Sequence, residues 1–149
     1  MPNIKKFLAK WIVDYYKNKD IMLGDIVSID ENKDGFDAII NEQDKKILCI
    51  ALDQPEKFNF NLNKEGFYVI VMLNRKESLD FLLNNWEKLV EFPNFKIFFI
   101  NPFSDTDKKW IISPYIHNKV CDEKALKTGL RSMFETVEPI IDRNLKNLG

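Results

Sequence analysis

Residues 67–100 read FYVIVMLNRKESLDFLLNNWEKLVEFPNFKIFFI, and this stretch decides the fold. It opens with an unbroken apolar run (67–73) and closes with a second, nearly unbroken one (95–100). Such runs are typical of strands that are covered on both faces. Between them, apolar residues recur at helical spacing from Leu79 to Val90. This order predicts a βαβ unit with two parallel strands and a right-handed crossover.

The ends of the intervening helix carry signals of their own. Asn74 is a residue type that caps helix N-termini, and Glu77 follows three positions later, so the two predict a capping box. Pro93 and Asn94 predict that the helix ends before the second strand begins.

Four further elements are predicted before this unit. Residues 3–18 have apolar side chains at i, i+3, i+4 and i+7 spacing, which predicts an amphipathic helix. Three strands follow at residues 25–30, 36–41 and 47–52, and the polar stretches between them predict tight turns. The third of these strands is continuously apolar, so we expect it to lie inside the sheet.

The rest of the chain adds shorter elements. Residues 58–63 (FNFNLN) alternate apolar side chains with Asn, which predicts either a one-sided edge strand or an extended loop that pins three apolar side chains. Asn is a poor strand former, which favours a segment at an edge of the sheet. Residues 110–113 (WIIS) predict a short strand antiparallel to the strand before it. Asp122 predicts the start of the last long helix, whose apolar residues run from Leu126 to Val137.

Together these elements predict one α/β domain over residues 1–149, a three-layer α/β/α sandwich with a central mixed β-sheet. Strands 47–52, 67–73 and 95–100 form its middle, and their hairpin partners lie toward the edges. Helices must cover both faces, because cover on one face would leave half of each buried strand in water. A last amphipathic turn is predicted at residues 140–148.

The composition is that of an ordinary globular protein. Lys and Arg number 22 and Asp and Glu number 23, so a net charge of −1 excludes a global attraction to nucleic acid or anionic lipid. No run approaches the ~20 apolar residues that a membrane helix needs, and the first residues lack the features of a signal peptide. The sequence therefore predicts a cytoplasmic protein that does not bind a membrane.

The chain contains two cysteines, Cys49 and Cys121, and a single histidine, His117. These are too few for the usual Cys/His zinc site, so we expect two free thiols in a reducing compartment. His117 and Cys121 lie four residues apart in a predicted connection between a strand and a helix. A Cys–His nucleophile pair is therefore one candidate for catalytic chemistry.

The first elements also carry a candidate metal site. A helix, three meandering strands, and then a helix with further strands resemble the PD-(D/E)XK, restriction-endonuclease-like fold over residues 3–100. In that family an Asp early in the second core strand binds magnesium, and a carboxylate and a Lys two residues apart on the third strand complete the site. The resemblance implies that the metal and the Lys activate water against a phosphodiester. Asp37, in GFDAII, fits the first acid.

The rest of that motif is degenerate. The third strand and its end, ILCIALD (47–53), contain no carboxylate and Lys at the required spacing, and their single acid is Asp53. A literal D-x-K at residues 44–46 falls in the predicted turn, from which side chains cannot reach the metal. Asp37 and Asp53 are therefore the candidate metal ligands, and no lysine is assigned.

These patterns predict a non-catalytic α/β domain that acts through protein association and needs no cofactor. No dinucleotide, P-loop or nucleophile-elbow motif occurs in the sequence. The predicted edge segments at 58–63 and 110–113 could pair with a second copy of the chain.

Two alternatives belong to other functional classes. The first is a divergent nuclease-fold protein that binds or cleaves nucleic acid with magnesium at Asp37 and Asp53. Two lysines beside a tryptophan at residues 108–110 add a pattern found in single-strand binding. The second is an enzyme whose site lies around His117 and Cys121.

Overall fold

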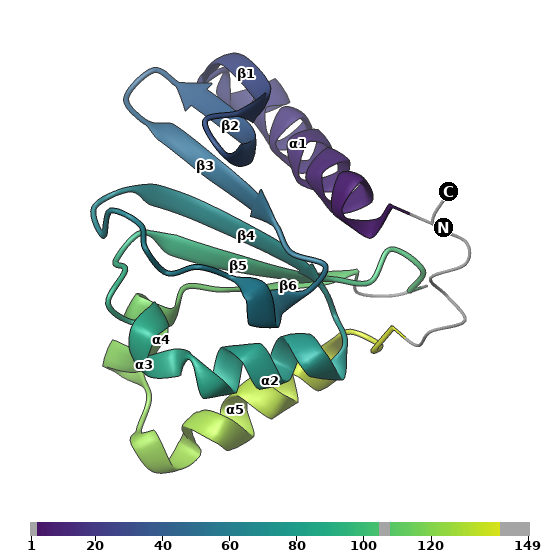
Figure 1. Ribbon diagram of the computed structural model, residues 1–149. Coiled ribbons are helices and arrows are strands. Elements are labelled where there is room, and N and C mark those ends of the chain that lie inside the picture. Colours follow the sequence, from purple (N-terminus) through teal and green to yellow (C-terminus); the bar gives the residue numbers. More distant parts are fainter. Residues whose placement is uncertain (1–2, 105–107, 141–149) are drawn as a thin grey trace.

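The computed structural model describes residues 3–104 and 108–140. Six strands form one mixed sheet in the order β1-β2-β3-β4-β5-β6, with helices packed on both faces, so the molecule is the predicted α/β/α sandwich (Figure 1). The strands are β1 (Ile26–Lys33), β2 (Phe36–Glu42), β3 (Lys46–Ala51), β4 (Phe67–Leu73), β5 (Phe95–Ile100) and β6 (Lys109–Ile112). The helices are α1 (Ile4–Leu23), α2 (Lys76–Asn84), α3 (Trp86–Leu89), α4 (Pro114–Val120) and α5 (Glu123–Thr136), with a 3₁₀ turn, η1 (Pro55–Lys57).

The three apolar strands are neighbours in the middle of the sheet, as predicted. β3 pairs with β4 and β4 with β5, both parallel. β1 and β2 form an antiparallel meander with β3, and β6 pairs antiparallel with β5. β3, β4 and β5 thus begin at one end of the sheet, where β6 ends and β1 begins. We call this the strand-start end.

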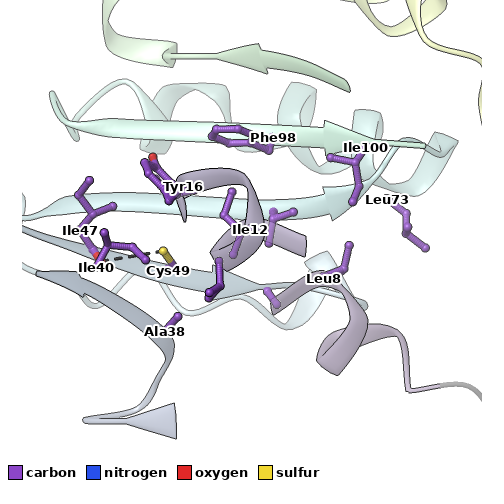
Figure 2. Close-up of a cluster of buried hydrophobic side chains, with 14 of the residues drawn as sticks. Leu8, Ile12, Tyr16, Ala38, Ile40, Ile47, Cys49, Leu73, Phe98 and Ile100 are labelled. Atoms are coloured by element: carbon purple, nitrogen blue, oxygen red, sulfur yellow. Dashed lines mark hydrogen bonds between the residues drawn. The ribbon is translucent and has the colours of Figure 1, made fainter. Parts of the chain in front are cut away.

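α1 covers one face of the sheet. Its buried residues Leu8, Ile12 and Tyr16 lie over a cluster that includes Cys49 of β3 and Phe98 of β5 (Figure 2). A second cluster fills the other face, beneath α2, α3 and α5 (Figure 1). The two clusters explain why β4 is apolar from Tyr68 to Leu73, because these successive side chains point alternately into one cluster and the other.

α1 continues past the predicted range of 3–18 to Leu23. It ends at Gly24, which has a left-handed backbone (φ +66°) and donates its N–H to the carbonyl of Asp20. The Asp20 carboxylate then accepts hydrogen bonds from the next backbone N–H groups, including that of Ile26 at the start of β1. Asp20 therefore fixes the connection between helix and sheet.

The edge segment favoured at 58–63 is wrong, because these residues form no strand, and the alternative of a loop that pins three apolar side chains is the one observed. Asn59 accepts a hydrogen bond from the N–H of Asn61, a local turn that competes with extended pairing. The apolar side chains of the segment pack onto the second cluster, where the ring of Phe60 stacks on Phe81 of α2. The free edges of the sheet are β1 and β6, so the edge predicted at 110–113 is the one confirmed.

The predicted capping box at Asn74 and Glu77 is also wrong. α2 begins at Lys76, and its N-cap residue, Arg75, makes no side-chain cap bond. Asn74 is fully buried just past the end of β4 and does not belong to the helix.

Asn74 joins three elements instead. Its Nδ2 donates to the carbonyls of Val137 (2.8 Å) and Phe134 (3.3 Å), and its Oδ1 accepts from Nε1 of Trp110 (2.7 Å). One buried amide therefore ties β4 to β6 and to the end of α5. Trp110 is buried and stacks on Phe99, so its ring is not exposed for stacking on a nucleic acid base.

The start of α5 is as predicted. Asp122 is its N-cap and accepts a hydrogen bond from the N–H of Lys124 (3.1 Å). Of the turn predicted at 140–148, only Ile140 lies within the described residues.

Candidate functional site

Asp37 lies in β2, at the end of the sheet opposite to the strand-start end, and protein groups already bond its carboxylate. Oδ2 accepts a hydrogen bond from the N–H of Ala51 (2.8 Å), and Oδ1 lies 3.7 Å from Nζ of Lys5. The last paired residues of the β2–β3 ladder are Ala38 and Cys49, so the Asp37 side chain replaces the next ladder bond. Asp37 therefore holds the end of β3 in place.

The β3 residues on the α1 side of the sheet are Ile47, Cys49 and Ala51, all buried, and Cys49 and Ala51 are the two near this carboxylate. A carboxylate and a Lys two residues apart would have to occupy these positions, and they hold a thiol and a methyl group. Burial raises the pKa of Cys49 to about 12, with the nearby charge of Asp37 as a second cause, so the thiol stays protonated. A neutral thiol is a poor ligand for magnesium, which prefers oxygen.

Asp53 follows the end of β3 in a bend of the chain. Its carbonyl accepts a hydrogen bond from Nη2 of Arg75, and no contact joins its carboxylate to Asp37 in the described residues. Within 3–104 and 108–140, no three His, Cys, Asp or Glu side chains lie close enough together to hold a metal ion.

The structure does bring His117 and Cys121 together. Cys121 Sγ lies 3.2 Å from Nε2 of His117. His117 lies on α4, which replaces the connection predicted there, and Cys121 is the C-cap residue one turn later. The imidazole ring rests edge-on against the indole of Trp86 at 5.8 Å.

This pair is not arranged for nucleophilic catalysis. Burial lowers the pKa of His117, so the imidazole is neutral at neutral pH and a weaker base than a free histidine. A nucleophile and base also need a third group that orients the base, and no side chain in the described residues bonds Nδ1 of His117. Cys121 and His117 therefore form a sulfur–nitrogen contact without the third group that a catalytic pair needs.

A further site lies at the strand-start end and was not singled out from the sequence. It is a groove of about 170 Å³ between α1, the starts of β3, β4 and β5, and the first turn of α4. Apolar and aromatic side chains line much of it, including Tyr16, Phe67 and Ile116, and Phe67 and Ile116 are 39% and 58% exposed.

Lysines surround this groove. Lys45 and Lys96 line it, and Lys19 stands over the ring of Tyr16 at its side. The pKa of Lys96 is lowered, first by partial burial and then by the positive charges of Lys19 and Lys45. Lys45 pairs with Glu42 (3.4 Å), whereas Lys96 makes no ion pair in the described part of the chain. We call this site the lysine-rimmed groove.

An exposed apolar corner lies at the same end, where α1 passes into β1. Its members are Ile21, Met22, Leu23 and Val27, with exposed fractions of 77%, 90%, 59% and 70%. The corner and the groove were missed because residues distant in sequence meet only in the folded sheet. A signal for the corner was present, since three consecutive apolar residues before Gly24 fit neither face of an amphipathic helix.

No protein-family model, curated protein or solved structure matches this chain. The resemblance to the PD-(D/E)XK fold therefore stays a prediction from the order of the elements. None of the helices in the described ranges combines the length and apolar character needed to cross a membrane.

The first prediction concerns Asp37. We expect Asp37→Ala to lower the free energy of unfolding by about 1–2 kcal/mol, because the N–H of Ala51 loses its acceptor. Asp37→Asn should lower the free energy of unfolding by less than about 1 kcal/mol, because the Asn side chain still offers an acceptor oxygen. Magnesium or manganese should not raise the melting temperature of the parent chain, since the carboxylate is already bonded. Asp80→Asn, an exposed change on α2, is the matched control. A metal-dependent rise in the parent that Asp37→Asn and Asp53→Asn abolish would contradict this.

The second prediction concerns Cys121. His117→Gln should leave the rate of Cys121 alkylation by iodoacetamide nearly unchanged, because no third group in the described residues orients the imidazole as a base. Cys49 is fully buried and should not react in the folded chain. Peptide mass spectrometry separates the two sites. Fast, pH-independent alkylation of Cys121 near neutral pH that His117→Gln removes would reveal a preformed thiolate instead.

Proposed function

We propose that this domain has no chemistry of its own and acts by binding another protein through its strand-start end. The observation that carries the proposal is the exposed apolar corner beside the lysine-rimmed groove. Single exposed apolar side chains are ordinary, whereas a group of them at one place is characteristic of an interaction surface.

The corner is held in a defined shape. Gly24 closes α1, and Asp20 bonds the following backbone through both carboxylate oxygens. Surfaces that are ordered before binding lose less conformational entropy when a partner docks. Met22 and Val27 therefore stand on a prearranged scaffold on which a partner can bury them.

The alternative of a nucleic-acid-binding nuclease fold has weaker support. A groove of about 650 Å³ beside Asp37 carries Lys5, Lys6 and Lys10, which favours an anionic ligand. However, Glu31 lines the same groove and Lys5 is paired with Asp37, so its charge is mixed. We also propose that the protein is cytoplasmic, in keeping with its two free thiols.

The test compares the parent chain with Met22→Gln/Val27→Gln, which removes apolar contacts without changing the charge. Lys76→Gln, an exposed change at the start of α2 and so at the opposite end of the sheet, is the control. Sedimentation velocity would detect a second copy of the chain, and quantitative mass spectrometry of tagged protein recovered from its host would detect other partners.

We expect at least one associated protein whose recovery falls about tenfold or more in the double variant, because buried apolar anchors at an interface contribute ~2 kcal/mol or more. Lys76→Gln should retain it. If every associated species is recovered equally with the parent chain and with the double variant, the proposal is wrong.

A further inference from the structure

We infer that the lysine-rimmed groove receives an acidic segment of the partner that carries a large apolar side chain. This inference rests on the proposed function, because it describes the partner that docks at the strand-start end. It adds a chemical class of ligand and the residues that select it.

The size of the groove favours a side chain over a free small molecule. Its volume of about 170 Å³ is below the range of roughly 300–1,000 Å³ that is common for cofactor and drug-sized sites. Phe67 and Ile116 leave apolar surface exposed at its mouth, and Tyr16 lines it from α1. One apolar side chain entering from a partner would cover this surface.

The positive charge of the groove favours a partner segment in which an acidic residue lies next to that apolar side chain. Lys96 has no carboxylate partner in the described residues, and Lys19 and Lys45 stand close enough to lower its pKa. Three like charges around one opening repel each other, and Glu42 offsets part of this repulsion. A carboxylate brought by a partner would relieve this repulsion, which gives the site its charge complementarity.

The same lysines favour a peptide over a nucleic acid. Lys45 stands 5.3 Å from the ring centroid of Phe67, and Lys19 stands 5.9 Å from that of Tyr16, so a cation already covers one face of each ring. Base stacking needs free aromatic faces, and none of the described residues that line the groove is an Arg that could form a fork with phosphate. The exposed apolar corner at the same end matches a protein surface better than a phosphate backbone.

The experiment measures fluorescence anisotropy with a labelled peptide of Glu, Asp, Leu and Phe, and with the same peptide carrying Gln and Asn in place of its acids. The variants are Lys96→Glu, Lys45→Gln and Phe67→Ser, all at exposed or half-exposed positions, with Lys76→Glu as the matched charge reversal at the opposite end. Circular dichroism checks that each variant is folded.

We expect the acidic peptide to bind more tightly than the neutral one. Lys96→Glu should weaken its binding about tenfold or more, which corresponds to ~1.4 kcal/mol, and Lys45→Gln and Phe67→Ser should weaken it less. Lys76→Glu should bind as the parent does. Added salt should weaken binding to the parent, because the contact includes exposed charges.

Equal binding of both peptides, or unchanged binding by Lys96→Glu, would overturn the inference. So would an anionic lipid vesicle or a single-stranded oligonucleotide that binds more tightly than the peptide in a Lys96-dependent way. A protein partner that is lost with Met22→Gln/Val27→Gln but retained with Lys96→Glu would support the proposed function and contradict only the inference about the groove. A peptide that needs Lys96, with no protein that needs Met22 and Val27, would refute the proposed function of the corner alone.

Discussion

The whole structure depends on one constraint, that β3, β4 and β5 carry apolar side chains on both faces and must be covered on both. Burying a large apolar side chain is worth ~1.5–3 kcal/mol, and the central strands contribute several such residues to each face. α1 supplies the cover on one side, and α2, α3 and α5 supply it on the other. The positions of the turns, the outer strands and the candidate sites follow from this arrangement of sheet and helices.

The helical layers cover both faces of the sheet, but the residues at its two ends differ in how far they are buried and bonded. Where the central strands end, polar side chains form hydrogen bonds within the protein. Asn74 ties β4 to β6 and α5, and Asp37 bonds the end of β3. Where they begin, apolar and cationic side chains such as Met22 and Lys96 stay exposed without a partner of their own in the described residues. This contrast is why we assign structural roles to one end and binding to the other.

The sequence predicts the central strands well because their signal is local and strong. The bounds of 67–73 and 95–100 agree with β4 and β5, since an unbroken apolar run has few other stable placements. Asn74 misled the prediction because a buried amide and a helix cap look alike until the residues that bond them are known. The edge segment at 58–63 was predicted wrongly because alternating apolar residues show which side chains can be buried but not whether the backbone pairs with a strand.

The candidate sites show the same limit. His117 and Cys121 are four residues apart, so one helical turn brings them together, and their proximity could be predicted from the sequence. Which β3 residues come near Asp37 depends on strand register, which pairs Ala38 with Cys49 and brings the N–H of Ala51 to the Asp37 carboxylate. The lysines at 19, 45 and 96 come from a helix, a turn and a strand, and only the assembled sheet brings them to one opening.

The most direct test of this account is to locate the contact surface by NMR. Amide shifts of the isotope-labelled chain would be recorded while the acidic, apolar peptide is added. We predict that the shifted amides gather at the strand-start end, around Phe67, Lys96 and Ile116, and that the signals of amides around Asp37 do not shift. Shifts centred on Asp37 and Lys5, with the strand-start end unchanged, would contradict it.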